Sequence, residues 1–509
     1  MNLYLLNQVF YPFFCLVVLT SILGYGNIIK KNKYINDKFY NLKNLIFIQG
    51  LIFVSLFTII FNYFTPITNI ITLLIIFIGS LIYLVCFFNL KKKKKEIIFI
   101  IFTVILSFVF SFYSGVGDDF VYHYETIQNF KNNNIFEISH HRRVSYNSHW
   151  LFLISVFSID DLTSTIFVLT SLIYSILIYD LYNLYLKSFK NKNYYIGLCS
   201  FFILIFFLGV LNKYKDFGTD IPGTIILFYV LLIFMYFIFE QKNKNANNLL
   251  FFIIPLISIA FIIKITNSLI IIFFLLLGLK LNFKSINYKY LFIPLSLSLL
   301  LPLLWFFQNL NISGCLIWPI EFTCYKNNEL ALVEYYLIES FAKGDISTSM
   351  NVDGYMWILT WLDNHAKKLV ETYLVFTLII LLPASYYLLK NREISKESIN
   401  FYLKYFNNPN YLALISIVFI SNLLWFFYAP AYRFGIFYNL SLIIFLILPF
   451  WLKLIQSNYK LTLKFCRIIS LIAFIYFLII NVNKFNWYFE RYDVWPPIEE
   501  NKLIPRKKF

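Results

Sequence analysis

Charged residues are scarce in this chain of 509 residues, because Asp, Glu, Lys and Arg together make up only 14% of it. About a quarter is usual for a soluble domain, so the composition excludes an ordinary soluble globular protein. Hydrophobic residues account for 60%, and the mean hydropathy is +0.70. Many uninterrupted apolar runs reach about 18 residues, which is the length that a helix needs to cross a bilayer.

The apolar runs also lack the alternation of polar and apolar residues that a membrane β-barrel requires, and they therefore predict helices. We expect an all-α, polytopic integral membrane protein with about fourteen transmembrane helices. The N-terminus lacks the charged segment and the small-residue cleavage site of a secretory signal peptide. The first apolar run should therefore remain in the protein as a span.

Lysines give the chain a formal charge of +17, but they do not form one extended basic surface. They gather in short segments between alternate apolar runs, at residues 30–43, 91–95, 187–192 and 390–398. This is the positive-inside pattern, so we expect these segments to face the cytoplasm and anionic lipid. No nucleic-acid partner is expected, and the loops 114–161 and 308–368 are predicted to lie outside.

The densest polar stretch, residues 117–150, contains four of the five histidines. Polar groups at the edge of a bilayer are costly unless they have a function. Asp118 and Asp119 repel one another, which makes one of them a better proton acceptor or a metal ligand beside His123. The simpler interpretation is that one aspartate caps a helix that starts near Phe120.

The end of this stretch carries His141, Arg142, Arg143 and Asn147. An arginine fork binds phosphate oxygens in two places, as a lipid-linked substrate at the headgroup level would require. Contact with lipid headgroups, with Trp150 as an interfacial anchor, is the alternative. A zinc site is also open, but the spacing of the histidines matches no closed ligand set.

Three further charged residues stand at the ends of apolar runs or within them. Asp220 precedes Ile-Pro-Gly, a pattern that fits an aspartate capping the next helix as well as a functional residue. Lys264 interrupts the apolar run 249–279, and we expect a hairpin turn there that brings it to the outer face; snorkelling is the alternative. Arg433 is expected to bind a phosphate or to anchor the end of a span.

Cys315 and Cys324 flank Trp318-Pro319 in the outer loop 308–368. In an oxidising compartment a disulfide between them is expected to hold a tight loop. Two free thiols are the alternative.

Motifs in these stretches resemble those of the GT-C superfamily, the multispanning glycosyltransferases that use polyprenyl-phosphate sugars. Asp118-Asp119, followed by His123, resembles the acidic motif of an outer loop in that superfamily. Asp220-Ile221-Pro222 resembles its Asp-x-Pro at the start of a later span. Two other recurring features are a polar break in an apolar run and a proline beside an aromatic residue, here Lys264 in KITNS and Ile317-Trp318-Pro319.

A closer resemblance is to a bacterial group of membrane proteins with a loop of the form DTGLYH…H-x-R-x-x-x-N-S-x-W and a late Pro-x-Arg-Phe. The corresponding residues here are Asp118, Tyr122, His123, His141, Arg143, Asn147, Ser148 and Trp150. The late motif is one residue longer, Pro430-Ala-Tyr-Arg433-Phe434. In most GT-C enzymes the acidic loop follows the first span, whereas here it follows the fourth.

The resemblance therefore implies three parts: additional N-terminal transmembrane helices at 1–96, a GT-C-like core at 97–482, and a tail at 483–509. It implies a bacterial inner (plasma) membrane protein whose active-site loop faces the periplasm or the outside. The implied reaction moves a sugar from a polyprenyl-phosphate-linked donor to an acceptor glycan or lipid. No cofactor is certain, and a divalent metal remains open.

The same resemblance assigns roles to the residues quoted above. Asp118 is expected to be the general base or to orient the acceptor hydroxyl, with Asp119 or His123 supporting it. The expected substrate- or phosphate-binding residues are His141, Arg142, Arg143, Asn147, Asp220, Lys264 and Arg433.

Two other functions fit parts of the pattern. An O-antigen or capsule polymerase would use the same kind of substrate, but would depend on arginines in two large outer loops more than on paired carboxylates. A transporter or flippase of lipid-linked sugars would need charged residues deep in several spans and an internal repeat. The predicted spans here contain no charged residues apart from Lys264, Asp180 and a few residues at their ends.

Overall fold

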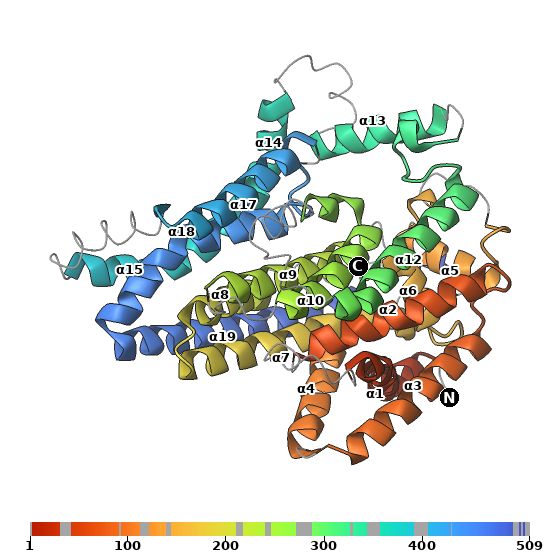
Figure 1. The fold of residues 1–509 in the computed structure, drawn as a ribbon, viewed down its shortest axis with the longest axis horizontal. Coiled ribbons are helices and arrows are strands. Elements are labelled where there is room, and N and C mark those ends of the chain that lie inside the picture. The colour runs from red at the N-terminus through yellow and green to blue at the C-terminus, as the bar shows by residue number, and fades with distance from the viewer. Residues whose placement is uncertain are drawn as a thin grey trace.

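The structure is a computed structural model, and the ribbon in Figure 1 is made almost entirely of helices. It describes residues 3–30, 42–90, 93–111, 122–138, 144–209, 217–239, 246–270, 288–325, 329–343, 357–390, 406–428, 430–491, 498–499 and 502–503. The predicted all-α class is confirmed. The strands among these residues are β1 (Ile498–Glu499) and β2 (Lys502–Leu503), which pair antiparallel.

The N-terminal half contributes helices as follows: α1 (Leu3–Lys30), α2 (Lys43–Asn62), α3 (Asn69–Phe88), α4 (Lys93–Ser111), α5 (Tyr124–Asn132), η3 (Val144–Tyr146), α6 (His149–Val156), η4 (Thr163–Phe167), α7 (Val168–Lys190), α8 (Tyr194–Gly209) and α9 (Asp220–Phe239). The C-terminal half contributes α10 (Ala246–Ile263), η6 (Ile265–Ile270), α12 (Tyr288–Ser313), η8 (Glu321–Thr323), α13 (Glu329–Lys343), α14 (Trp357–Leu369), η10 (Val370–Leu374), α15 (Val375–Lys390), α17 (Pro409–Tyr428), α18 (Ile436–Ser457) and α19 (Tyr459–Arg491).

Eight helices within the described residues are long and apolar enough to cross a membrane, by length and composition. They are Gln8–Ile28, Lys43–Asn62, Asn69–Phe88, Thr163–Lys190, Leu295–Ser313, Pro409–Tyr428, Ile436–Ser457 and Tyr459–Trp487. Three further apolar helices are shorter, at Tyr194–Gly209, Asp220–Tyr236 and Ile253–Ile263. The expectation of many apolar spans is therefore met at this coarser level.

The central helix is α7, which is almost wholly buried and packs against α1, α2, α4, α8 and α9. Outer helices such as α3 instead expose large apolar side chains, among them Ile70, Phe77 and Phe88, which are 71%, 61% and 69% exposed. In water, a chain is stabilised by burying apolar surface, and apolar faces of this size would be costly to expose. The exposed apolar faces of these helices therefore suit hydrocarbon as the surrounding solvent.

The helices α1, α2 and α3 meet backbone to backbone through glycines. A Cβ atom at Gly50 would collide with the carbonyl oxygen of Ile22, and one at Gly26 would collide with that of Ile46. Gly24 meets the carbonyl oxygen of Gly79 in the same way. Small residues allow such close approach, which is how helices associate when there is no water to drive them together.

A buried carboxylate joins α7 to the start of α2. Asp180, which is 2% exposed, accepts hydrogen bonds from the backbone N–H groups of Lys43 (3.0 Å) and Asn44 (2.9 Å) and from the hydroxyl of Tyr229 (3.0 Å). The first N–H groups of a helix have no partner within the helix. Asp180 therefore caps α2 from a neighbouring helix.

The short helix α6 follows the polar stretch, and all eight of its residues are buried. It packs against α2, α5 and α10 and does not lie on the surface. Trp150 is 0% exposed and donates to the hydroxyl of Thr170 (3.0 Å), so its interpretation as an interfacial anchor is wrong.

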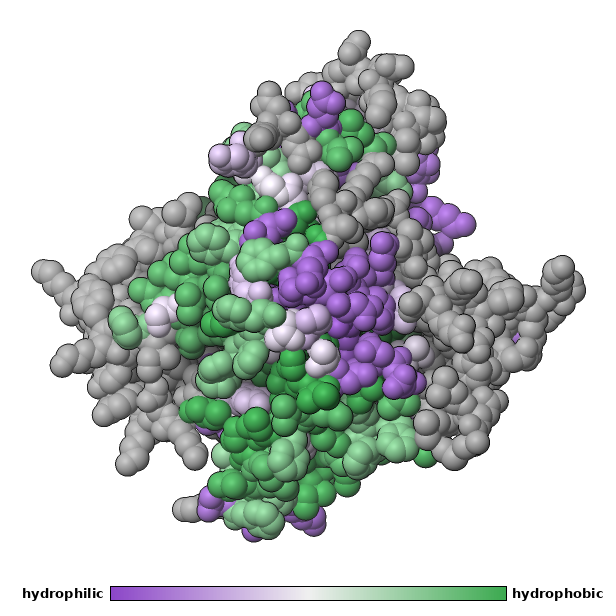
Figure 2. Space-filling model, turned by 90° about the vertical axis from the view of Figure 1, so that its right-hand side faces the viewer, coloured by the Kyte–Doolittle hydropathy of each residue, from purple (hydrophilic) through white to green (hydrophobic). Residues whose placement is uncertain are grey.

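Figure 2 shows that hydrophilic residues gather at the end of the molecule where α5 lies, bordered by apolar surface.

Candidate functional site

Three charged residues from distant parts of the sequence meet in one cluster, here called the charged cluster: Asp220, Lys264 and Arg433. The ammonium group of Lys264 forms an ion pair with Oδ1 of Asp220. Nε of Arg433 lies 3.4 Å from Oδ2 of the same carboxylate. The side chains are 15%, 19% and 31% exposed respectively, so the cluster is mostly desolvated while the guanidinium remains accessible.

Helix ends explain why these residues lie there. Asp220 is the first residue of α9, where the partial positive charge of a helix N-terminus favours an anion. Lys264 immediately follows α10, whose C-terminus favours a cation. Arg433 lies in the turn before α18. The predicted break at Lys264 is confirmed, and the return helix expected up to residue 279 extends outside the described residues.

An aromatic ring completes the surroundings of both cations. Nζ of Lys264 lies 3.4 Å from the ring centroid of Phe434, and Cζ of Arg433 lies 5.4 Å from it. A ring face attracts a cation more strongly where water is excluded. Phe434 belongs to the motif Pro430-Ala-Tyr-Arg433-Phe434, and the sequence did not predict its contact with Lys264.

Three side chains fix the backbone around Lys264. Ser148 donates to the carbonyl oxygen of Ile263 (2.8 Å), and Asn267 donates to that of Ala260 (3.0 Å). Tyr438 of α18 donates to the carbonyl oxygen of Thr266 (3.0 Å). Carbonyl groups at the end of a helix lack internal partners, so these bonds hold the segment that carries Lys264.

The end of the polar stretch 117–150 is held in the same way, residue by residue. Tyr146 bonds Glu334 (2.7 Å), Asn147 bonds Asn309 (2.7 Å), and Nε2 of His149 lies 2.8 Å from the Ser55 hydroxyl. The indole of Trp305 donates to the carbonyl oxygen of Asn147 (2.7 Å). Asn147 is 1% exposed, and its amide joins the polar stretch to α12.

The predicted catalytic residues are only partly within the described residues. His123 is 6% exposed, and its ring centroid lies 6.0 Å from that of Phe217, three residues before Asp220. His123 therefore lies against the segment that leads into Asp220. The other predicted residues, Asp118, Asp119, His141, Arg142 and Arg143, lie outside the described residues.

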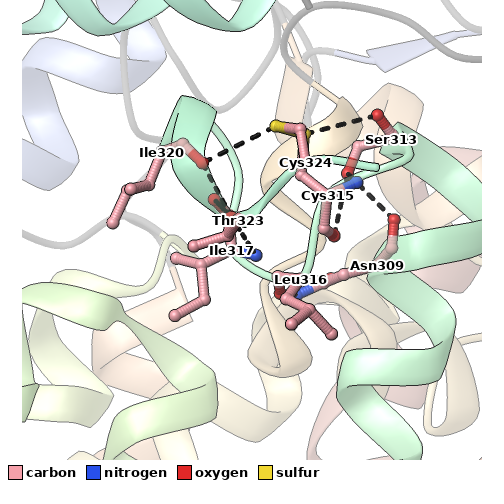
Figure 3. Close-up of a disulfide and its surroundings, with 8 residues drawn as sticks. All are labelled: Asn309, Ser313, Cys315, Leu316, Ile317, Ile320, Thr323 and Cys324. Atoms are coloured by element: carbon pink, nitrogen blue, oxygen red, sulfur yellow. Dashed lines mark hydrogen bonds between the residues drawn. A yellow bond between two sulfur atoms is a disulfide. The ribbon is translucent and has the colours of Figure 1, made fainter. Parts of the chain in front are cut away.

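The predicted disulfide between Cys315 and Cys324 is present (Figure 3). It closes a loop in which the N–H of Leu316 donates to the carbonyl oxygen of Thr323 (3.0 Å), and Thr323 donates to that of Ile317 (3.0 Å). Asn309 of α12 donates to the carbonyl oxygen of Leu316 (2.8 Å). Because Asn309 also bonds Asn147, the loop and the polar stretch are connected through α12.

No group of three His, Cys, Asp or Glu side chains that could hold a metal ion is found in the described part of the chain. A metal ligand set within the site would therefore have to include residues outside those ranges.

Lys131, at the end of α5, gives the polar stretch a pH-dependent tether. Its ammonium group donates to Asn69 (2.8 Å) and to the carbonyl oxygen of Ser158 (2.6 Å), and lies 3.8 Å from Asp160. Burial lowers the pKa of Lys131 from 10.5 to about 8, and the charge of Asp160 partly opposes this. The protonated form is thus less favourable in the folded chain than in the unfolded one.

We expect the contribution of Lys131 to the free energy of unfolding to rise between pH 8 and pH 10.5, because the unfolded chain binds more protons there. The full rise is at most about 3 kcal/mol. Chemical unfolding of the wild type and of Lys131→Met in detergent, compared across this window, measures it. A constant difference between the two proteins at all pH values would contradict the expectation.

Comparison with known families gives one match of large extent. The family described as "Domain of unknown function (DUF8201)" matches residues 9–440. No curated protein and no solved structure matches the chain. The matched span contains Asp220, Lys264, Arg433 and both cysteines of the disulfide, and it ends within α18.

Proposed function

The chain belongs to this family, whose description names no activity, and we propose from the contacts of the charged cluster that it is a membrane glycosyltransferase of the GT-C kind. It would move a sugar from a polyprenyl-phosphate-linked donor to an acceptor glycan or lipid. The observation that carries the proposal is that one carboxylate holds two cations at neighbouring helix ends. Lipid-linked sugars carry a phosphate, which a pair of cations of this kind would bind.

The two cations suit a phosphate for separate reasons. The guanidinium of Arg433, 31% exposed, presents a planar fork for paired oxygens. Lys264 is a point charge, held between Asp220 and the ring of Phe434. Asp220 orients both and keeps them apart, so that they need little rearrangement when an anion arrives.

In the proposed reaction the hydroxyl oxygen of the acceptor forms a bond to the anomeric carbon of the donor sugar. The bond between that carbon and the phosphate oxygen breaks, and the hydroxyl proton passes to Asp118. The leaving polyprenyl phosphate gains a negative charge, which Lys264 and Arg433 stabilise. Asp119 and His123 support the base.

The proposed topology has about fourteen spans in a bacterial plasma membrane. The three shorter apolar helices that pack inside the molecule, and segments outside the described residues, would add to the eight long ones. Supporting features are the basic segments at alternate connections and the disulfide of the outer loop, since disulfides persist on the oxidising side. The charged cluster would then face the periplasm.

Binding of undecaprenyl monophosphate to the purified protein in lipid nanodiscs tests the proposal. Lys264→Ala and Arg433→Ala should each raise the dissociation constant about 10- to 100-fold, since each removes a charge-assisted contact. Lys187→Ala, which removes an exposed lysine of a predicted inner segment, should leave it unchanged. Wild-type affinity in both cluster variants, with their melting temperatures preserved, would refute the proposed phosphate site.

A further inference from the structure

Arg433 lies in residues 430–435, a connection between α17 and α18 that has no helical backbone of its own. Two buried indoles bind the carbonyl groups that precede it. Nε1 of Trp361, on α14, donates to the carbonyl oxygen of Pro430 (2.7 Å). Nε1 of Trp425, on α17, donates to that of Ala431 (3.1 Å).

Each of these two hydrogen bonds satisfies a need of both partners. An indole nitrogen only donates, and a buried carbonyl group requires a donor. Trp361 and Trp425 are each 4% exposed, and their ring centroids lie 6.4 Å apart. The ring of Trp361 also meets Phe426 edge to face at 5.0 Å, so neither indole can turn away without disturbing the other.

The two sides of the connection are held as well. On α14, the ring centroid of His365 lies 6.1 Å from that of Tyr432, and Nζ of Lys368 lies 5.2 Å from the same ring. At the other end, a Cβ atom at Gly435 would collide with the ring of Trp425. The connection is thus held at its start, at the residue before Arg433 and at its end.

We infer that Trp361 and Trp425 are positioning residues for Arg433: by binding the carbonyl groups of Pro430 and Ala431 they place its guanidinium beside Asp220. The ligand of that guanidinium rests on the proposed function, but its placement does not. The end of the segment 308–368 thereby helps to position Arg433, since α14 supplies the indole of Trp361 to this connection.

Trp361→Phe and Trp425→Phe remove the donors while retaining an aromatic ring. Trp451→Phe is the matched control, because Trp451 is 0% exposed and its indole likewise donates to a backbone carbonyl, that of Ile380 (3.2 Å). We expect the two positioning variants to weaken binding of undecaprenyl monophosphate about 5- to 20-fold, and the control to change it less than about twofold. Similar losses of thermal stability in all three would leave the affinity difference as the signature of positioning.

A second readout does not depend on the lipid. In Arg433→Cys, the rate of thiol modification by a charged methanethiosulfonate reports the exposure of position 433. Adding Trp361→Phe should change this rate at least about threefold, whereas adding Trp451→Phe should not. Equal rates and equal affinities in the tryptophan variants and the control would overturn the inference. If Arg433→Ala binds the lipid normally while the modification rates differ as expected, the proposed function fails and the positioning role stands. If Trp425→Phe does not fold, Trp361→Phe alone decides the outcome.

Discussion

Replacing Asp180 with alanine is expected to lower the free energy of unfolding by about 3–5 kcal/mol. Asp180 is 2% exposed and accepts three hydrogen bonds, two of them from the first N–H groups of α2. Alanine leaves those groups and the Tyr229 hydroxyl without that acceptor in a buried place. The effect is large because burying an unpaired donor costs more than the bond itself contributes.

Thermal and chemical unfolding in detergent measure this change. Asp180→Asn retains one oxygen as an acceptor and should lose about half as much. Asn183→Ala, one turn further along α7, removes an exposed side chain that bonds only its own helix, and should have little effect. If Asp180→Ala melts at the wild-type temperature, Asp180 does not stabilise the start of α2.

The second large effect is expected at Asp220, where alanine should lower the free energy of unfolding by about 2 kcal/mol. The removal leaves the charges of Lys264 and Arg433 without the carboxylate that both of them approach. The value is below that of a fully buried ion pair because the three side chains are 15–31% exposed and solvent screens them.

A double-mutant cycle isolates the interaction. In a background that carries Lys264→Met and Arg433→Met, the change Asp220→Ala should cost less than about 0.5 kcal/mol. The same cost in the wild-type and double-methionine backgrounds would mean that the carboxylate acts alone. Lys264→Met by itself should give an intermediate value, since Arg433 still approaches the carboxylate.

The sequence predicted Asp220, Lys264 and Arg433 as candidate site residues, but not that one carboxylate pairs with both cations. Lys264 is conspicuous because the run around it is apolar, and Asp220 because it stands where an apolar run begins. Their ion pair joins residues that are 44 positions apart on different helices, a relation that hydrophobic pattern does not encode. The break at Lys264 and the disulfide were predicted because both depend on local composition.

Backbone groups explain most of what the sequence did not predict. The indoles of Trp361 and Trp425 bind carbonyl groups, and every residue has one, so no pattern marks the partner. The bond of Asn147 to Asn309 was not predicted, because a polar side chain in a polar stretch has the same sequence pattern whether it faces solvent or a second helix. Trp150 was an interfacial anchor in the alternative interpretation, because tryptophan is enriched at membrane interfaces, and it is buried.

Helix type was easier to predict than helix count. Apolar length predicted the all-α class, and eight helices meet the length and composition of a span within the described residues. Three helices of similar apolarity are shorter and packed inside the molecule, at Tyr194–Gly209, Asp220–Tyr236 and Ile253–Ile263. Hydropathy alone does not decide which of these three cross the membrane, since a short buried helix and a span are both uniformly apolar.

The glycine contacts of α1 bear on the order in which the protein assembles. The nearest atoms to Gly24, Gly26 and Gly50 belong to helices within the first 90 residues. This segment leaves the ribosome before α7 has been made, so its three helices are able to close on one another first. The hydroxyls of Tyr11 and Ser171, 2.7 Å apart, then give α7 a place to dock. A methyl group at Gly26 would therefore disturb the nascent chain at its earliest stage, long before the charged cluster exists.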